Sequence, residues 1–255
     1  MDHWPDVDRV LWRARESAFP PGEFVGQESL VSASEIRWLG ERAGLREGVS
    51  VLDLCCGVSG PGLLLVEEFG CGYLGVDADG GSIDRARLRA AEAGLSAQFE
   101  VVSVPPVPTG TFDVVLLLET FLAFRDKGVL LHEVASALPV GGRFAFTVEE
   151  GRALSPEERA VMPGGDTVWL TPLASLRPDL ERAGFEVRWM ADRSQAHRVV
   201  VDALADAYQG CGAGIHGLRG AELISQLVTS HRLWSRWLGL GRVRKFVVVA
   251  EKMWA

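Results

Sequence analysis

The sequence lacks the features of a membrane protein or of a basic nucleic-acid-binding protein. No run of about eighteen uncharged apolar residues is present, so no segment is predicted to cross a membrane. Acidic residues precede the first apolar stretch, which argues against a signal peptide and favours a cytoplasmic protein. The net charge at pH 7 is -8, whereas a protein that binds nucleic acid by neutralising phosphates is normally basic. A nucleic-acid partner is therefore not expected.

Cysteine is scarce, with 4 residues in a chain of 255, and none of the spacings is Cys-x-x-Cys. Neither a disulfide framework nor a zinc knuckle is indicated, and we expect reduced, buried thiols. No cluster of histidine, cysteine and aspartate has the spacing of metal ligands, so no metal is predicted. Internal repeats and low-complexity tracts are absent as well.

The composition is that of an ordinary globular protein, with 47% hydrophobic and 24% charged residues. Residues 1–47 have the apolar spacing of amphipathic helices; Ser34 is the expected N-cap of the second helix, and Gly44 ends it. From residue 48 onwards, short apolar runs alternate with helical patterns. Seven strands are predicted, at residues 49–54, 73–76, 98–102, 112–118, 143–148, 185–190 and 243–250. Helices are predicted at residues 61–69, 82–93, 127–138 and 172–183, with two or three more within 194–239.

Uninterrupted apolar strands that alternate with helices indicate an α/β fold, a doubly wound sheet covered on both faces. The last strand is expected to lie antiparallel beside the sixth. We divide the chain into an N-terminal helical arm or lid (1–47), a ligand-binding core (48–150), and the rest of the sheet (151–255). The last part contains a helical substrate cap at about 194–239.

In an open sheet of this kind, ligands bind at the carboxyl ends of the strands, near the point where strand order reverses. A glycine-rich stretch, residues 57–62, follows the first strand, and glycine lets a backbone approach a ligand closely. Asp77 ends the second strand, where a carboxylate can accept both hydroxyls of a ribose. A dinucleotide and S-adenosylmethionine both fit this arrangement. Asp53 and the glycine spacing disfavour the dinucleotide, because a carboxylate there suits a cationic amine better than a pyrophosphate.

Four motifs resemble those of the class I S-adenosylmethionine-dependent methyltransferases. VLDLCCGVSGPG (51–62) resembles their motif I, and YLGVDAD (73–79) resembles the acidic motif that follows it. FDVVLLLETFLAF (112–124) resembles the fourth-strand motif, and LPVGGRFAFTVEE (138–150) resembles the turn and fifth strand. Their order and spacing agree over roughly residues 48–150. The layout is similar to the small-molecule branch of this family, and the resemblance implies a Rossmann-like methyltransferase fold.

The resemblance implies S-adenosylmethionine as cofactor and S-adenosylhomocysteine as product. It implies these cofactor-binding residues: Asp53, Cys55, Cys56, Gly57, Gly60, Asp77, Ala78, Ser103, Val104 and Leu118. Asp77 would bind the ribose hydroxyls, Asp53 the loop or the cofactor amine, and the Leu118 carbonyl the amine. Cys55 replaces a usual glycine, so its backbone is expected to stay in a region open to an L-residue. An acidic residue frequent at the adenine edge is missing near Ser103.

Two residues are predicted to be catalytic. Glu119 ends the fourth strand and would act as a base or hydrogen-bond acceptor, or else position the loop or the cofactor. His197 begins the helical cap and could face the acceptor, with a surface or capping role as the alternative. Glu149 and Glu150 could face the substrate at the end of the fifth strand, or could be solvated loop acids.

Phe24 and Gln27 of the N-terminal arm are further predicted substrate contacts. Together with the aromatic residues of the cap, they suggest a closed pocket for a small, partly apolar molecule. The predicted function is methyl transfer to a small molecule, and specialised metabolism is one setting for it. Transfer to oxygen, nitrogen or carbon, the use of a general base and the oligomeric state stay open. The alternatives are a cofactor-binding protein that does not methylate, such as a cyclase or a silent homologue, and a nicotinamide dinucleotide oxidoreductase.

Overall fold

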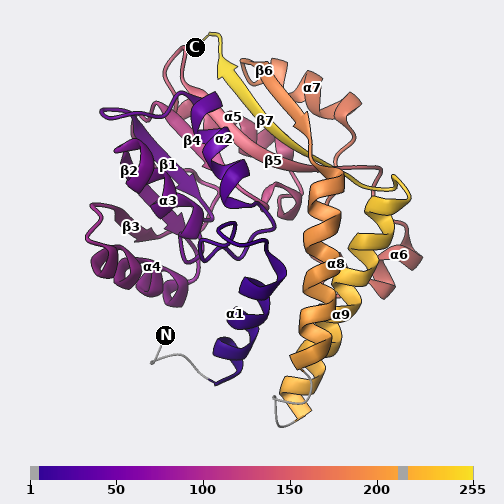
Figure 1. Cartoon of the computed structure of the whole chain (residues 1–255). Helices are drawn as coiled ribbons and strands as arrows, with labels where there is room; N and C mark the ends of the chain where they lie inside the picture. The colour runs from indigo at the N-terminus through magenta and orange to yellow at the C-terminus, as the bar shows by residue number, and fades with distance from the viewer. Residues whose placement is uncertain (1–5, 212–217, 255) are drawn as a thin grey trace.

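The computed structural model describes residues 6–211 and 218–254. A seven-stranded sheet forms its centre, with helices on both faces (Figure 1). The strands are β1 (Ser50–Leu54), β2 (Gly72–Asp77), β3 (Gln98–Val101), β4 (Val114–Leu117), β5 (Arg143–Glu150), β6 (Phe185–Asp192) and β7 (Arg244–Lys252). The α-helices are α1 (Asp6–Ala18), α2 (Ala33–Ala43), α3 (Gly60–Phe69), α4 (Gly80–Ala93), α5 (Lys127–Ser136), α6 (Pro156–Val161), α7 (Leu173–Arg182), α8 (Ser194–Cys211) and α9 (Leu218–Gly239). Two short 3-10 helices are η1 (Phe121–Ala123) and η2 (Gly165–Thr167).

The strand order is β3-β2-β1-β4-β5-β7-β6, which confirms the doubly wound sheet. Strands β1 to β5 are parallel to one another, and strand order reverses between β1 and β4. The last strand, β7, is antiparallel to β6, as predicted, and it is also antiparallel to β5. The sequence did not predict that β7 would lie between the two. Helices α8 and α9 follow β6 and bring the chain back to the sheet beside the same strand, where β7 then pairs with β6.

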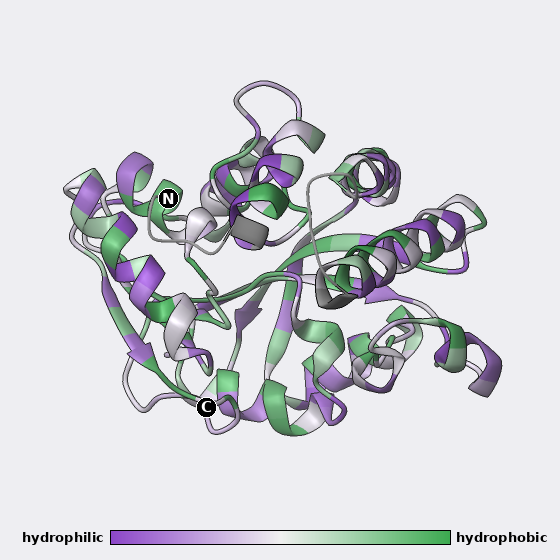
Figure 2. Ribbon diagram, turned by 90° about the horizontal axis from the view of Figure 1, so that it is seen from below, coloured by the Kyte–Doolittle hydropathy of each residue, from purple (hydrophilic) through white to green (hydrophobic). Residues whose placement is uncertain are grey.

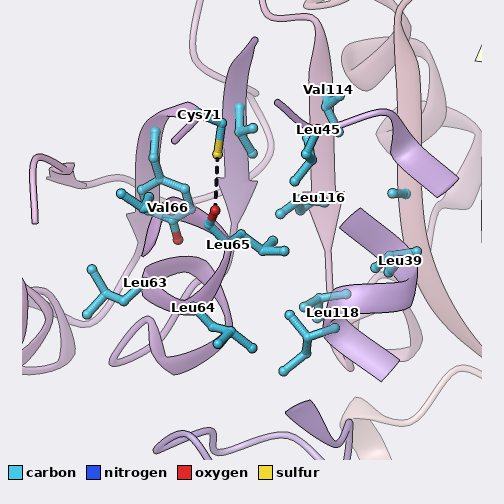
Figure 3. Packing of buried hydrophobic residues seen from close by; sticks show 14 of the residues in the cluster. Leu39, Leu45, Leu63, Leu64, Leu65, Val66, Cys71, Val114, Leu116 and Leu118 are labelled. Carbon is cyan, nitrogen blue, oxygen red and sulfur yellow. Dashed lines mark hydrogen bonds between the residues drawn. The ribbon is translucent and has the colours of Figure 1, made fainter. Parts of the chain in front are cut away.

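Alternating side chains of the central strands build two separate hydrophobic cores. Val114 and Leu116 of β4 pack under α2, α3 and α4, whereas Val115 and Leu117 pack under α5 and α7. This alternation follows from the two-residue period of a strand. Figure 3 shows the first core, in which Leu39 of α2 approaches the sheet. Figure 2 shows that apolar residues line the sides of the helices that face the sheet.

The two helices of the predicted N-terminal arm have different positions. α2 carries Ile36, Leu39 and Ala43 into the first core. α1 packs instead on α8 of the predicted helical cap, and Figure 1 shows α1, α8 and α9 below the sheet. Of the two helices of the predicted arm, α2 therefore belongs to the core of the sheet domain, and α1 belongs to the cap.

Helix α2 begins two residues earlier than the sequence predicts. Ser32, not Ser34, is its N-cap, and Ser32 forms a reciprocal capping box with Glu35. A glutamate three residues after the cap makes this start favourable, because both orphan N–H groups gain a partner. Ser34 instead donates to the Glu23 carboxylate, with its backbone N–H 2.8 Å from Oε2. Gly44 ends the helix with φ 73°, as predicted.

Candidate functional site

A cavity of about 470 Å³ lies at the carboxyl ends of β1, β2 and β4, where strand order reverses. We call it the strand-end cavity. All ten residues predicted to bind a cofactor line it: Asp53, Cys55, Cys56, Gly57, Gly60, Asp77, Ala78, Ser103, Val104 and Leu118. Glu28, Ser29 and Thr120 line it as well, and the sequence did not single them out. The predicted residues thus meet in one place, because parallel strands end at the same edge of the sheet.

The loop after β1 has an unusual backbone. Cys55, Gly57 and Ser59 have φ values of 57°, 55° and 56°. The expectation that Cys55 would occupy an ordinary region for an L-residue is corrected, since it lies in the small left-handed region that costs such residues energy. Close packing around the loop restricts its residues further: a Cβ on Gly60 would lie 2.3 Å from the Gly26 carbonyl oxygen. The loop is therefore held against the N-terminal segment in a shape that opens toward the cavity.

The Asp77 carboxylate fixes this loop from the neighbouring strand. Its Oδ2 accepts from the Gly57 N–H at 2.9 Å, and its Oδ1 accepts from the Asp79 N–H at 2.9 Å. A carboxylate has about four lone-pair positions, so Asp77 can accept further hydrogen bonds from a ligand in the cavity.

Asp53 lies at the bottom of the cavity and is almost completely buried. Burial raises the pKa of Asp53 to about 7, opposed by the hydrogen bond from Tyr73 and assisted by the negative charge of Asp77. The Tyr73 hydroxyl lies 2.6 Å from Asp53 Oδ2 and 2.8 Å from Ser59 Oγ. Gly62 makes room for this hydroxyl, because a Cβ there would lie 2.0 Å from it. A cation in the cavity would therefore favour the charged form of Asp53.

A second cavity, of about 320 Å³, lies between the sheet edge and helices α8 and α9. We call it the helix-side cavity. Its apolar lining consists of Leu30, Leu122, Met162, Val168, Val201, Trp234, Leu238 and Val243. Its polar lining includes Arg15, Glu149, His197, His231 and Lys245. Glu28, Ser29 and Glu119 line both cavities, so the two cavities adjoin at these three residues.

Glu119 lies at this junction, directly after β4. Its backbone has φ 60°, and its N–H donates to Thr147 Oγ1 at 2.7 Å. Lys245 of β7 lies 2.5 Å from Glu119 Oε1 and also donates to Glu149. Burial alone would lower the pKa of Lys245, but the two carboxylates raise it above its usual value. The alternative that Glu149 is a solvated loop acid is wrong, because it is a buried residue of β5 paired with this lysine.

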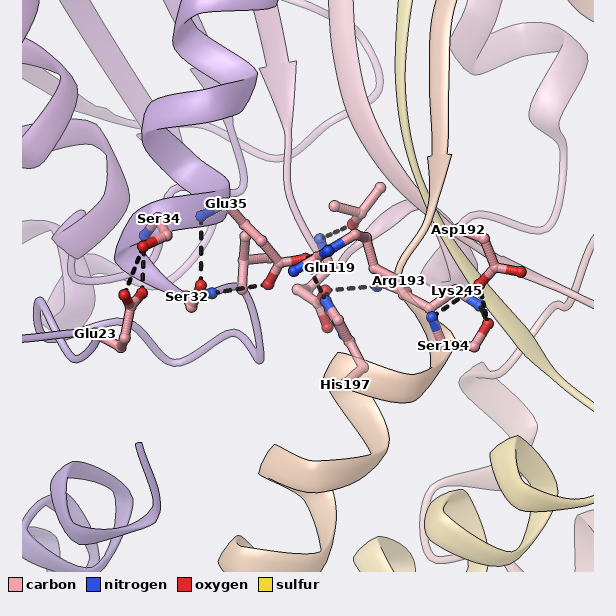
Figure 4. Close-up of polar contacts among 12 residues, drawn as sticks. Glu23, Ser32, Ser34, Glu35, Glu119, Asp192, Arg193, Ser194, His197 and Lys245 are labelled. Carbon is pink, nitrogen blue, oxygen red and sulfur yellow. Dashed lines mark hydrogen bonds and ion pairs between the residues drawn. The ribbon is translucent and has the colours of Figure 1, made fainter. Parts of the chain in front are cut away.

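His197 is buried in α8, with 1% of its surface exposed, so a surface position is wrong. Its ring lies between two carboxylates: Nε2 is 3.3 Å from Glu35 Oε1, and Nδ1 is 3.8 Å from Glu119 Oε1. Neither ring nitrogen has a hydrogen bond to any described part of the chain. Figure 4 shows the ring beside Glu35, Glu119 and Lys245. The structure thus brings the two predicted catalytic residues together.

Phe24 and Gln27 line neither cavity. Gln27 is completely buried, and its side chain bonds to the backbone of Glu23, Val25 and Val31. Phe24 packs in the small core between α1 and α8. Both residues shape the N-terminal segment, so the structure places them away from any ligand in these cavities. Gln27 has the polar groups of a ligand contact, but its own loop uses them.

The sequence missed several residues of the helix-side cavity. Of the cap aromatics singled out from the sequence, only Trp234 lines it. His231 also lines it, and its Nδ1 is 2.7 Å from the Leu227 carbonyl oxygen. Lys245 alternates with Val247 and Val249 in the final strand, which was a signal available in the sequence, because a lysine on a buried face requires acidic partners. Glu35 had no such signal, since an acidic residue in the first turn of a helix is ordinary.

Among residues 6–211 and 218–254, no group of three or more histidine, cysteine, aspartate and glutamate side chains is arranged to hold a metal ion. In the same two ranges, no helix has both the length and the apolar character needed to cross a membrane.

Residues 51–142 match the family model described as "Methyltransferase domain". Over 118 residues the chain is 30% identical to a probable chloroplastic tocopherol O-methyltransferase of Oryza sativa, covering 45% of this chain and 33% of that protein. It is 29% identical over 143 residues to a sarcosine/dimethylglycine N-methyltransferase of Halorhodospira halochloris, covering 53% of this chain and 51% of that protein. The chain thus spans about half or less of the length of these relatives.

Solved structures share the whole fold at low sequence identity. A putative sarcosine dimethylglycine methyltransferase from Galdieria sulphuraria superposes with a TM-score of 0.81 at 16% identity, covering 98% of this chain and 99% of that one. The cyclase SpnF superposes with a TM-score of 0.75 at 20% identity, covering 98% of this chain and 94% of that one. A cyclase and a methyltransferase share this fold, so the fold alone does not fix the reaction.

Proposed function

We propose that the protein is a class I S-adenosylmethionine-dependent methyltransferase that methylates a small molecule, from the premise that residues 51–142 match a methyltransferase domain. One observation carries the proposal. The ten residues that the family resemblance implies as cofactor-binding line the strand-end cavity, which adjoins a second, mostly apolar cavity at Glu119. The proposal therefore assigns the cofactor to the strand-end cavity and the acceptor to the helix-side cavity.

The donor set of the strand-end cavity fits S-adenosylmethionine. Asp77 would accept hydrogen bonds from the ribose hydroxyls, and Asp53 would face the amine of the methionine part. Ala78, Ser103 and Val104 would contact the adenine, with recognition through main-chain groups. The Asp53 carboxylate, in the first strand beside the glycine-rich loop, would repel the pyrophosphate of a dinucleotide, which disfavours the oxidoreductase alternative.

When bound, the cofactor supplies a methyl group activated on a positively charged sulfur. The chain would hold the acceptor in line with the carbon–sulfur bond and keep water out of the junction. The new bond forms between the acceptor atom and the methyl carbon, and the carbon–sulfur electron pair stays on sulfur. A protic acceptor also loses a proton, which His197 or Glu119 would accept. Of these two, His197 is the better base, because Lys245 already binds the Glu119 carboxylate.

The lining of the helix-side cavity supports an acceptor with an apolar body and one protic group. Its walls are mainly aliphatic side chains and Trp234, whereas its polar end carries His197, Glu119 and Lys245. Sarcosine, tocopherol and sterols appear in the names of the relatives, and this cavity favours the more apolar of these classes. We also propose that α1, α8 and α9 contact the acceptor, whereas residues 48–150 contact the cofactor.

The first experiment is calorimetric titration with S-adenosylmethionine, S-adenosylhomocysteine and NAD. The proposal expects binding of the first two and none of the third; binding of NAD alone would overturn it. The second experiment measures transfer of a labelled methyl group from S-adenosylmethionine to a series of acceptors. The acceptors share one apolar body and differ only in the nucleophile, which is a hydroxyl, an amine or a carbon. Cofactor binding without transfer to any acceptor would favour the non-methylating alternative. The predicted cytoplasmic location and lack of a nucleic-acid partner stay predictions.

A further inference from the structure

We infer that Glu35 is the positioning residue that keeps the Nδ1 atom of His197 free to accept a proton from the acceptor. This inference rests on the proposed function, and it concerns a residue that lines neither the strand-end nor the helix-side cavity. Glu35 instead borders a separate surface hollow of about 390 Å³ beside α2. It therefore acts on the acceptor only through the histidine ring.

The groups around Glu35 stabilise its charged carboxylate. Arg193 Nε donates to Glu35 Oε1 at 2.7 Å, and the Ser32 N–H donates to Oε2 at 3.2 Å. Burial alone would raise the pKa of Glu35, but His197, Arg193 and the Ser32 N–H together lower it to about 2. The carboxylate is thus ionised at neutral pH and is 4% exposed. Figure 4 shows this side chain between Ser32 and the histidine ring.

The two ring nitrogens of His197 face different surroundings. Nε2 lies 3.3 Å from Glu35 Oε1, whereas Nδ1 lies 3.8 Å from Glu119 Oε1. The same Glu119 oxygen is only 2.5 Å from Lys245 Nζ, so the ammonium already offsets part of its negative charge. The single proton of the neutral ring is therefore favoured on Nε2, beside Glu35. The lone pair then remains on Nδ1, on the side of the helix-side cavity.

The inferred step completes the reaction proposed above. The acceptor atom bonds to the methyl carbon while the carbon–sulfur bond breaks and its electron pair stays on sulfur. The proton of the acceptor moves to Nδ1 of His197, and Glu35 stabilises the resulting imidazolium through Nε2–H. A base oriented by a third group is the arrangement used by activated nucleophiles generally.

The test uses the full-length protein labelled with ¹⁵N in its histidine rings, with and without S-adenosylhomocysteine. The His197 signals are assigned by comparison with His197→Gln, and their ¹⁵N shifts report which nitrogen carries the proton at pH 8. We expect the Nε2–H form to dominate in the wild type. In Glu35→Gln its excess over the Nδ1–H form should fall roughly tenfold, because an amide oxygen is a weaker acceptor than a carboxylate.

The variant is chosen to leave the helix intact. Glutamine at the third helical position preserves the capping box with Ser32, so α2 keeps its start. Glu35→Met, which has no acceptor at all, is the second variant and should shift the ratio at least as far. Glu41→Gln is the matched control, since it removes one charge from the same helix beside the same hollow and should leave the ratio unchanged.

A wild-type ring with its proton on Nδ1, or with protons on both nitrogens at pH 8, would overturn the inference without any variant. An unchanged ratio in folded Glu35→Gln and Glu35→Met would overturn it too. The proposed function fails separately, if the wild type does not bind S-adenosylhomocysteine in calorimetry. The protonation of the ring without that ligand still tests the role of Glu35.

Discussion

The strand-end and helix-side cavities adjoin, but they are built in different ways. The strand-end cavity comes from the ends of β1 and β2 and from the residues that directly follow β1, β2, β3 and β4, apart from Glu28 and Ser29 of the N-terminal segment. The helix-side cavity takes its residues from segments that are far apart in the chain, between Arg15 and Lys245. Local sequence motifs therefore specify the first cavity, and tertiary packing assembles the second.

The two cavities also differ in how their acids are paired. Asp53 and Asp77 of the strand-end cavity face each other's negative charge, and burial raises the pKa of Asp53 to about 7. Glu119 and Glu149 of the helix-side cavity share the Lys245 ammonium, and Glu35 nearby is paired with Arg193. The strand-end cavity is suited to receive a cation. The acids around the helix-side cavity are already paired, and the histidine between them carries the open lone pair.

The largest expected effect is on catalysis through the helix-side cavity. His197→Gln removes the proposed base and should lower kcat roughly 10²- to 10⁴-fold for a protic acceptor found in the labelled-methyl screen. The affinity for S-adenosylhomocysteine should not change, because His197 does not line the strand-end cavity. His132→Gln, in an exposed position of α5, is the control. An unchanged kcat in His197→Gln would remove the base from the mechanism.

The next effect is on stability. Lys245→Met leaves Glu119 and Glu149 buried without their counterion, and it should lower the free energy of unfolding by about 3–5 kcal/mol. Arg244→Met, the neighbouring residue of β7, removes an exposed pair with Asp192 and should cost about 1 kcal/mol or less. Urea unfolding of both variants measures the difference. Equal losses would mean that the buried cluster contributes no more than a surface pair.

A smaller effect is expected in the strand-end cavity. Asp77→Ala removes the carboxylate proposed to bind the ribose hydroxyls, and it should weaken S-adenosylhomocysteine binding by about 1–3 kcal/mol. Calorimetry measures the change, with Asp84→Ala on the exposed side of α4 as the control. Retained affinity in Asp77→Ala would reject the assignment of Asp77 to the ribose hydroxyls.

The smallest effect is a pH dependence that belongs to the strand-end cavity. Because the pKa of Asp53 is raised to about 7, the carboxyl is protonated below that pH and cannot attract the cofactor amine. Affinity for S-adenosylmethionine should therefore rise as pH increases through 7, by up to tenfold per unit, or about 1.4 kcal/mol.

The matched ligand for this experiment is methylthioadenosine, which lacks the amine. Its affinity should not change over the same pH range, and calorimetry at pH 6, 7 and 8 compares the two ligands. Tyr73→Phe should move the transition to higher pH, because the Tyr73 hydrogen bond favours the charged carboxylate. The same pH dependence for both ligands would remove Asp53 from amine binding.

Much of the fold was predictable because its signals are local. Apolar runs of strand length, glycines at turns and amphipathic spacing located the seven strands and most helices within a few residues. The position of β7 between β5 and β6 was not predictable, since it depends on where the α8–α9 excursion returns. Helix α6 and the short η1 and η2 were missed, because brief helical turns have no periodic pattern long enough to detect.

The sequence by itself determined the seven strands and the strand-end cavity, because in a parallel sheet every strand end reaches the same edge. It also identified Glu119 and His197 as candidates, but not their partners. Only the tertiary structure placed Glu149 beside Lys245, 96 residues away, and Arg193 beside Glu35, 158 residues away. Charges buried in a low-dielectric interior need partners, and residues this far apart in the chain become partners only when packing brings their elements together.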